Sequence, residues 1–570
     1  MDVSYQNANV YAGNESTLLR FHTNDGTTAC ILIDAGDGVD LDALLADDEY
    51  LNAILLTHGH IDHYRTLGDN VRHNAPIYTA PATATIVERA LPEAQKHNDL
   101  GTVSDALNAL EPIEDWTAIL PNLEVRPIPV GHTPGAVGFV IRFHDEASAN
   151  STFDDEMQYL LATGGFTTRP CAGFPGLETA LPVDIDAVLL NVATTDESTP
   201  HLNDSLRTIL ERGFAGSPVV VATSALTGVH YATLLGHLVN ELDRTLPIRL
   251  VGQTAKLWDD LDFDTPNVES QWVFSEPSEV LDSGAITICG PDEPVRGNAK
   301  RLFGAIEDDP SAVFVQLTTG GAEPASSGSC TTHAFEVINH PTPETLDETV
   351  AELAPQHVVI KHATGGELNR FQKRYDECFT WGTNDDHEHT LYEAGEWVAP
   401  GWLTDRVVQK IRMQQWQALS DKPVATRESF PTPERTPVDV AAEGVAVDEF
   451  RDQFSTQSIE TDHDGRTSGP SASTKNQELH PETTQDVRDD PAAASSPDPE
   501  TDSFESTVLT RLDAIESKLD AKVATETVTA QVLSGDGQTF LQVLDETDLP
   551  PGQMVELQIR EATSEDDSSS

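Results

Sequence analysis

Apolar residues in the first 195 positions occur in short runs that alternate with amphipathic stretches. Residues 29–34 read as a buried strand that enters the Ala35-Gly36 turn, and residues 51–57 read as another strand. A short strand leading into a helix is predicted from residue 78 to about 91, and residues 137–143 and 159–162 continue the sheet. Buried strands that alternate with helices are typical of an α/β sandwich, and this is the fold class we predict.

A second α/β pattern follows from about residue 196 to 330. Its predicted strands are 217–223, 248–252, 284–289 and 312–317, and residues 231–242 read as a helix. Residues 331–421 then return to the earlier style, with a helix near 344–353 and a strand at 357–360. The simplest interpretation is an α/β insertion at 196–330 that interrupts a first domain, which residues 1–195 begin and residues 331–421 close.

The rest of the chain has a different composition. Residues 422–503 are rich in Pro, Ser, Thr, Asp and Glu and poor in aliphatic residues, which predicts a disordered acidic linker. In residues 504–561, Val508, Leu512, Ile515 and Leu519 have the 4-3-4 spacing of a short coiled coil, or equally of an ordinary amphipathic helix. Turn residues then mark a small β module at 527–559. We expect this segment to mediate homo-oligomer formation or the docking of a protein partner.

The chain has 570 residues, too many for a single core, and a formal net charge of −61 from 95 acidic and 34 basic residues. An acidic tail, a basic partner or a high-salt cytoplasm of the haloarchaeal type would each account for such an excess. The acids run through the folded-looking regions and Lys is scarce, which favours the high-salt explanation. At molar salt the Debye length is only about 3 Å, so net charge neither supports nor excludes an RNA substrate.

The cysteines and the N-terminus indicate the compartment. Five cysteines lie far apart without a CxxC pair, which fits a reducing cytosol: Cys30, Cys171, Cys289, Cys330 and Cys378. The first residues contain no export signal, and no apolar stretch approaches the roughly 18 residues that a membrane span needs. The sequence therefore predicts a soluble, cytoplasmic protein without a membrane segment.

The densest group of metal-ligand residues directly follows the predicted strand at 51–57. Four side chains within six residues can ligate a metal: His58, His60, Asp62 and His63. Side chains two positions apart point the same way, so His58 and His60 can share one ion, while Asp62 and His63 can serve a neighbouring one. Imidazole and carboxylate ligands suit Zn²⁺ or similar ions. The alternative, a histidine-rich surface loop, is disfavoured by this spacing after a strand.

These residues resemble the HxHxDH motif of the metallo-β-lactamase superfamily, whose fold is an αββα sandwich. The resemblance continues along the chain. Asp34, at the end of its strand, matches the first-motif Asp of the family, which implies that it supports the metal loop without ligating. His132, within residues 131–135 (GHTPG), matches the third-motif histidine, which implies that it ligates the first ion with His58 and His60.

The insertion and the segments around it resemble the β-CASP nucleases, a group that includes ribonuclease J and mRNA 3′-end-processing factors. Residues 217–235 and 288–301 are similar to a strand–helix segment and a Gly-rich loop of that group, and the resemblance covers roughly residues 5–415. His340 and His362 stand where the group has its motif B and motif C histidines. The resemblance implies that Asp62, His63 and His362 hold a second ion. It also implies catalytic roles for Asp62 and His340, with His340 contacting the scissile phosphate or donating a proton.

Two positions depart from the family pattern. Gly165, within residues 160–166 (LLATGGF), stands where the fourth motif has the Asp that bridges the two ions. Asn191, after the strand at 187–190, stands where motif A has an acid. Each change removes a carboxylate, and no neighbour in the sequence is an evident substitute. We therefore expect the first site to fill and the second to be weak.

The resemblance implies a zinc-dependent ribonuclease, similar to mRNA 3′-end-processing factors, that cleaves phosphodiester bonds of RNA with one or two Zn²⁺ ions. The missing carboxylates leave a second interpretation, an impaired homologue that acts as an RNA-binding or regulatory subunit. A third is another hydrolase of the same fold, such as a β-lactamase or a thioesterase. The inserted domain disfavours this last interpretation because it would cover the site.

Overall fold

A computed structural model of the chain describes residues 1–23, 25–144, 157–196, 198–320, 322–326, 329–372, 374–375, 377–421, 429–454, 530–535 and 538–543. Residues 1–461 form one compact unit and residues 462–570 a second. In the second unit, the described residues form an antiparallel hairpin of β22 (Ala530–Gly535) and β23 (Gln538–Val543). This hairpin falls within the predicted β module, whereas the predicted helix around Val508 and Leu519 lies outside the described residues.

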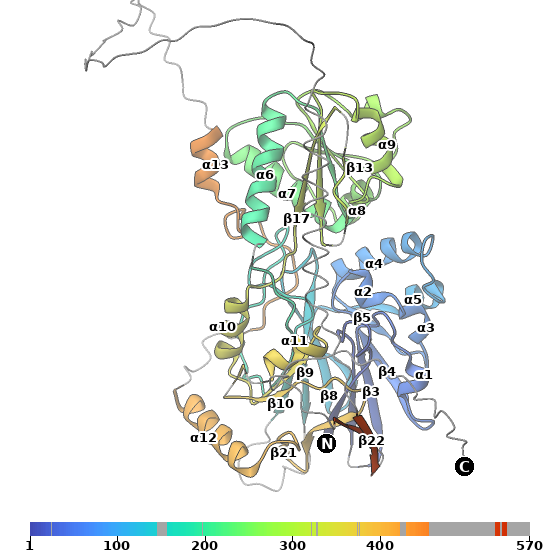
Figure 1. Ribbon diagram of the computed structural model, residues 1–570, viewed down its shortest axis with the longest axis vertical. Helices are drawn as coiled ribbons and strands as arrows, with labels where there is room; N and C mark the ends of the chain where they lie inside the picture. The colour runs from blue at the N-terminus through green and yellow to red at the C-terminus, as the bar shows by residue number, and fades with distance from the viewer. Residues whose placement is uncertain are drawn as a thin grey trace, which may run out of the picture. The chain divides into compact units, whose positions relative to one another are not determined.

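Two mixed sheets form the lower part of the first unit in Figure 1. The first has the strand order β21-β20-β1-β2-β3-β4-β5-β6 and the second has the order β19-β18-β11-β10-β9-β8-β7. The strands of the first sheet are β1 (Asp2–Asn7), β2 (Thr17–His22), β3 (Thr28–Ile33), β4 (Tyr50–Leu55), β5 (Ile77–Thr79), β6 (Leu110–Pro112), β20 (Glu388–Glu393) and β21 (Glu396–Trp397). Those of the second are β7 (Thr117–Leu120), β8 (Leu123–Pro129), β9 (Val137–His144), β10 (Met157–Ala162), β11 (Ala187–Asn191), β18 (His357–Lys361) and β19 (Phe379–Trp381).

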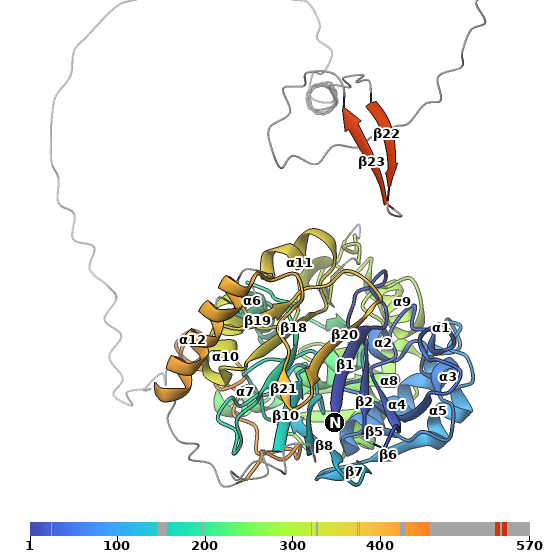
Figure 2. The ribbon, with the colours of Figure 1, turned by 90° about the horizontal axis from the view of Figure 1, so that it is seen from below.

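The side chains of β3 show why these sheets stack as inner layers. Ala29, Ile31 and Ile33 point into the core shared by the two sheets, whereas Cys30 and Leu32 point into the core under the helices. Helices therefore cover the outer face of each sheet, as Figure 2 shows. The first sheet carries α1 (Leu41–Leu44), α3 (Leu67–Asn70), α4 (Pro81–Ala94) and α5 (Val103–Ala109), and the second carries α10 (Pro343–Leu353) and α11 (Gly365–Phe371).

A third sheet is parallel throughout and has the order β14-β13-β15-β12-β16-β17. Its central strand β12 is apolar on both faces, because Val219 and Val221 pack into one core and Val220 and Ala222 into another. Helices surround it in Figure 1. Its elements are α6 (Ser198–Phe214), β12 (Val219–Ala222), α7 (Ala225–Glu241), β13 (Ile248–Val251), α8 (Gln253–Asp260), β14 (Val268–Gln271), η2 (Pro277–Glu279), β15 (Ile286–Cys289), α9 (Gly297–Ile306), β16 (Val313–Thr318) and β17 (Thr331–Glu336).

These three sheets confirm the predicted fold class, an α/β sandwich with a further α/β layer inserted in the chain. The limits proposed for each domain stay predictions, and one strand differs from them. Strand β17 pairs with β16 and belongs to the third sheet, although it lies beyond residue 330. The segment 331–336 is mostly polar and none of its residues is buried, a pattern that fits an edge strand of either sheet.

Residues 429–454, which composition placed in a disordered linker, are folded. Helix α13 (Val447–Phe454) lies beside α6 (Figure 1), and Phe450 and Phe454 pack into the core that covers the third sheet. Asn203 of α6 fixes the same segment, since its amide donates to the carbonyl of Gly444 and accepts from the N–H of Ala446, at 2.9 and 2.8 Å. The low average hydrophobicity of 422–503 hid these few anchors. Residues 455–503 lie outside the described part of the chain.

Helix α12 (Asp405–Asp421) precedes this segment. No helix in the described part of the chain is both long and apolar enough to cross a membrane. All five cysteines are buried and free of disulfides.

His357 on β18 is buried, and its titration should make the stability of the fold depend on pH in acid. It accepts a hydrogen bond at its Nδ1 from Trp381 Nε1 at 2.9 Å, and burial, with Arg412 nearby, lowers its pKa to about 3. The folded chain therefore binds a proton at this position far less readily than the unfolded chain, whose histidine pKa is about 6.5. The contribution of His357 to the free energy of unfolding is therefore complete above about pH 6.5 and is lost as the pH falls towards 3.

We expect His357→Gln, which keeps an acceptor but does not titrate, to flatten the acid limb by at most about 1.4 kcal/mol per pH unit. Denaturant unfolding of both proteins between about pH 4 and pH 7 measures this slope. Parallel curves for the two proteins would contradict it.

Candidate metal centre

Asp34 and Thr57 hold the loop that carries the histidines. Asp34 follows β3 with a positive φ of 54°, and its carboxylate is 1% exposed. It accepts hydrogen bonds from the backbone N–H and the hydroxyl of Thr57, both at 2.8 Å, and from Nδ1–H of His63 at 2.7 Å. The carboxylate thus orients the loop and the His63 ring, as expected of a supporting residue.

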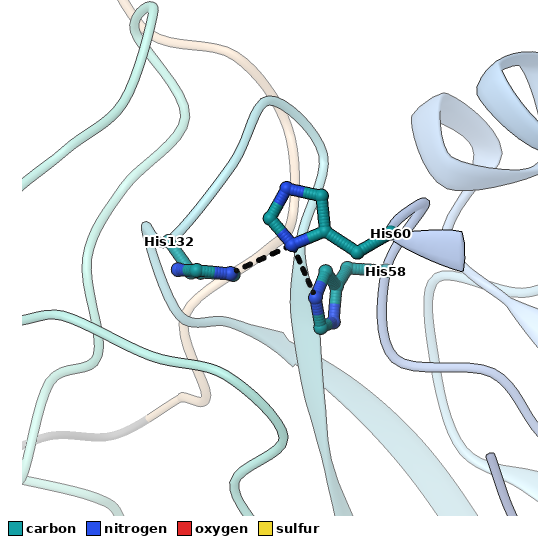
Figure 3. A group of neighbouring side chains, drawn as sticks. All are labelled: His58, His60 and His132. Atoms are coloured by element: carbon teal, nitrogen blue, oxygen red, sulfur yellow. Dashed lines mark hydrogen bonds between the residues drawn. The ribbon is translucent and has the colours of Figure 1, made fainter. Parts of the chain in front are cut away.

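Three of the predicted ligands converge at one point, as Figure 3 shows. His60 Nδ1 lies 3.1 Å from His58 Nε2 and 3.2 Å from His132 Nε2. Nitrogens that bind one tetrahedral Zn²⁺ at 2.0–2.1 Å are about 3.3 Å apart. The spacing of the three rings therefore fits a single metal ion.

Neighbouring groups fix the ring tautomers that a metal requires. The hydroxyl of Thr57 donates to Asp34, so it accepts Nδ1–H of His58 at 2.9 Å. The carbonyl of Asn339 accepts Nδ1–H of His132 at 2.8 Å. Both histidines are left with an Nε2 lone pair towards His60. Burial, together with the neighbouring imidazoles, holds the pKa of His58 and of His132 well below 6.5, so both rings are neutral and can bind a metal ion.

Asn339 orients the His132 ring, and sequence reasoning missed this contact. Besides its carbonyl, its side-chain amide donates to the backbone carbonyl of His132 at 2.7 Å. Asn339 directly precedes His340 in the sequence, but its contact joins positions 207 apart. Nothing local in the sequence signals such a contact.

The residues predicted for a second ion lie beside this cluster but do not converge in the same way. Asp62 Oδ2 is 3.7 Å from His63 Nε2, and the rings of His63 and His362 are 6.1 Å apart between centroids. Burial opposes protonation of His63, but Asp34 and Asp62 outweigh it and raise its pKa to about 9. Among the described residues, the group whose ligand atoms all lie within 4.8 Å of one another is His58, His60 and His132.

Asn191 controls the His362 ring. The backbone N–H of Ala193 donates to Asn191 Oδ1 at 2.9 Å, which fixes the amide orientation. The amide nitrogen of Asn191 therefore donates to His362 Nδ1, 3.1 Å away. In the neutral ring the proton then resides on Nε2, which becomes a hydrogen-bond donor and cannot bind a metal. A carboxylate at position 191 would favour the opposite tautomer.

Gly165 is closely packed against a ligand. A Cβ atom on Gly165 would lie 2.8 Å from Cδ2 of His132, closer than real contacts allow, and 3.1 Å from Nε2, which is a tight contact. The space that a larger side chain needs is thus occupied by the His132 ring. The glycine at this position is coupled to the present placement of a first-site ligand.

Glu15 is a carboxylate near the second set that the sequence did not reveal. It is 7% exposed, accepts a hydrogen bond from the amide of Asn9, and interacts electrostatically with His63 and Asp62. Burial raises its pKa to about 7, although His63 opposes the shift. The expectation that no acid compensates for the missing carboxylates is therefore incomplete, because tertiary packing brings Glu15 close to His63 and Asp62.

His340 lies flat against His132, with centroids 4.9 Å apart and an interplanar angle of 25°. Burial, reinforced by His362, lowers the pKa of His340 to about 3. The ring is neutral near pH 7, so it can donate a hydrogen bond from its N–H but is not a protonated acid. Its catalytic role stays a prediction.

The clustered histidines line a cavity of about 1030 Å³. Its walls come from the sandwich, through α2 (Ile61–Tyr64) and α4, and from the first turns of α7, α8 and α9 around the third sheet. The C-terminal ends of parallel strands commonly carry ligand sites. The inserted layer and the clustered histidines therefore line the same cavity.

Comparisons with known proteins agree with this geometry. Residues 30–153 match the family model of the beta-lactamase superfamily domain. The chain therefore contains a β-lactamase superfamily domain. This domain and its histidine cluster indicate a metallohydrolase with a metal-binding site.

No curated protein matches the chain. Among solved structures, it is similar to a crystal structure of a protein of unknown function from Enterococcus faecalis V583. That similarity has 14% identity and a TM-score of 0.48, and covers 68% of this chain and 99% of the other.

Proposed function

We propose that the chain is a zinc-dependent ribonuclease of the β-CASP type that cleaves phosphodiester bonds. The observation that carries the proposal is the convergence of three neutral imidazoles, with nitrogens 3.1 and 3.2 Å apart, on the wall of a large cavity. Imidazole ligands suit Zn²⁺ better than Mg²⁺ or Ca²⁺, and they also suit other transition-metal ions. A cavity of about 1030 Å³ can take several nucleotide units.

The charge of the cavity supports an anionic substrate. The whole chain carries −61, yet the cavity lining contains four cationic residues against three carboxylates. The cationic residues are Arg89, Lys256, Arg296 and Arg301, and the carboxylates are Asp62, Glu93 and Glu443. The first turns of α7, α8 and α9 also line it, and helix N-termini favour phosphate groups. Arg89 is paired with Asp260, so the lining is close to neutral in a chain that carries −61, and this favours an anionic substrate here over the rest of the surface.

A divalent ion held by His58, His60 and His132 would supply Lewis-acid activation of water and of the scissile phosphate. Thr57 and Asn339 keep the ligand tautomers fixed during the reaction. Neutral His340, which stacks on His132, would donate a hydrogen bond to a phosphate oxygen. Lys256 and Arg296 would hold flanking phosphates of the substrate.

One observation favours the second candidate, an impaired homologue that binds RNA or regulates a partner. The His362 tautomer set by Asn191 presents a donor where a second ion needs a lone pair. In-line phosphodiester cleavage by two ions would then lose one of its clamps.

Cleavage of labelled RNA by the full chain in molar KCl, with added Zn²⁺ or Mn²⁺, tests the proposal. We expect cleavage that His60→Ala abolishes and His97→Ala preserves, because His97 is exposed in the same cavity but lies outside the ligand cluster. RNA retention without cleavage would select the impaired homologue. A protein that neither retains nor cleaves RNA would reject RNA as the substrate. That result would leave the proposal of a metal site untouched.

A further inference from the structure

A second polar cluster lies on the cavity wall, apart from the metal ligands. Cys171 comes from the segment after β10, His230 from α7, and Glu443 from the folded segment 429–454, and all three line the cavity. His230 Nε2 lies 2.9 Å from Glu443 Oε2. The Cys171 thiol and the His230 ring also interact electrostatically. The histidine therefore stands between a thiol and a carboxylate.

The Glu443 carboxylate is rigidly placed. Its side chain is 0% exposed, and its two oxygens accept the backbone N–H groups of Ala172 and Gly173, both at 2.9 Å. A fully buried carboxylate that also accepts from His230 fixes the orientation of that ring. Glu443 thereby fixes both the backbone that follows Cys171 and the ring of His230.

The arrangement differs from a metal site. Among the described residues, these three are not a group whose ligand atoms lie within 4.8 Å of one another, unlike His58, His60 and His132. Instead, they follow the order nucleophile, histidine and orienting acid that activates thiols in proteins. Thiol chemistry therefore accounts for the cluster better than metal binding does.

Cys171 also differs from Cys289 and Cys378 in its surroundings. Burial raises the pKa of Cys289 and Cys378 to about 12, and no cation opposes the shift there. Burial raises the pKa of Cys171 as well, but His230 opposes the shift.

The charged groups that face the Cys171 thiol are His230, Glu443 and Arg169. Burial opposes protonation of His230, but Cys171 and Glu443 outweigh it and raise the His230 pKa to about 10. An imidazolium beside the sulfur promotes thiolate reactivity.

We propose that Cys171, His230 and Glu443 form a reactive thiol site on the cavity wall, which takes small disulfides by thiol–disulfide exchange. The Cys171 thiol loses its proton and its sulfur attacks one sulfur of the disulfide. A new S–S bond joins Cys171 to that half, and the other half leaves as a thiolate that takes up a proton. Cys171 is oxidised, the small disulfide is reduced, and no metal is required. The inference is independent of the proposed ribonuclease activity.

Modification of the folded full chain by 2,2′-dithiodipyridine, a small neutral disulfide, tests the site through the absorbance of the released 2-thiopyridone. We expect one thiol per chain to react rapidly and peptide mass spectrometry to identify it as Cys171. Cys171→Ser should remove the rapid phase. The matched control Cys289→Ser should retain the rapid phase. Cys289 is also buried, but burial alone raises its pKa and no histidine opposes the shift.

His230→Asn should slow the rapid phase at neutral pH by about tenfold or more, since one pKa unit changes the thiolate population about tenfold. It should also displace the pH profile of the rate. Should this variant not fold, Glu443→Gln, which keeps the shape of the side chain, carries the same test. A rapid phase that persists in Cys171→Ser, the absence of any rapid thiol before unfolding, or an unchanged profile in a folded His230 or Glu443 variant would overturn the proposal.

Discussion

His60→Ala is expected to remove the bound metal, from about one ion per chain to none. His60 Nδ1 is the atom that lies within 3.2 Å of both other ligand nitrogens, so its loss leaves two imidazoles for an ion that needs at least three protein ligands. Loss of a supporting group alone costs 10–100-fold in metal affinity, and loss of a ligand should exceed about 100-fold. Elemental analysis after equilibration with Zn²⁺ and dialysis measures the change.

The matched control for this experiment is His97→Ala. His97 lines the same cavity and is exposed, so its removal should leave the metal content unchanged. Denaturant unfolding of the metal-free proteins would confirm that both variants are folded. Full metal content in a folded His60→Ala protein would show that the three rings do not form the site.

Asn191→Asp is expected to strengthen a second metal site and raise the metal content from about one towards two ions per chain. The substitution keeps the size of the side chain and the acceptor for the N–H of Ala193, but replaces the amide donor by a carboxylate. Nδ1–H of His362 would then donate to the new carboxylate, and Nε2 would carry a lone pair on a ring that neighbours Asp62 and His63. Zn²⁺ titration by calorimetry, together with elemental analysis, measures the second site.

Asn191→Ala separates the two parts of this explanation. It removes the amide donor without adding a carboxylate, so we expect a smaller gain in metal content than from Asn191→Asp. A folded Asn191→Asp protein with unchanged stoichiometry would show that the His362 tautomer does not limit the second site.

Gly165→Asp is a less promising route to the same goal. The sequence comparison suggests it directly, because the family has an Asp there. A Cβ at this position would nevertheless meet the His132 ring at 2.8 Å, so the first site would have to shift before the second could gain a ligand. Restoring one carboxylate in this way endangers the histidine cluster.

The sequence predicted the sandwich well because its signals are local. Strands such as β3 and β12 are apolar on both faces, which requires layers on either side wherever they lie in the fold. Averaged composition was less reliable. It placed residues 429–454 in a linker, although a few spaced residues such as Phe450 and Phe454 suffice to anchor that segment on α6.

The sequence by itself predicted His58, His60 and His132 as ligands of one ion, because the spacing of His58 and His60 after a strand places both imidazoles on one loop and the position of His132 followed from the family pattern. In the structure, these three histidines form a group that could hold a metal ion. Only the tertiary structure decided the state of the surrounding groups. Glu15, Asn339, and the Cys171–His230–Glu443 cluster arise from contacts between segments far apart in the chain. Tautomers and pKa values depend on such contacts and on burial, which the order of residues does not specify.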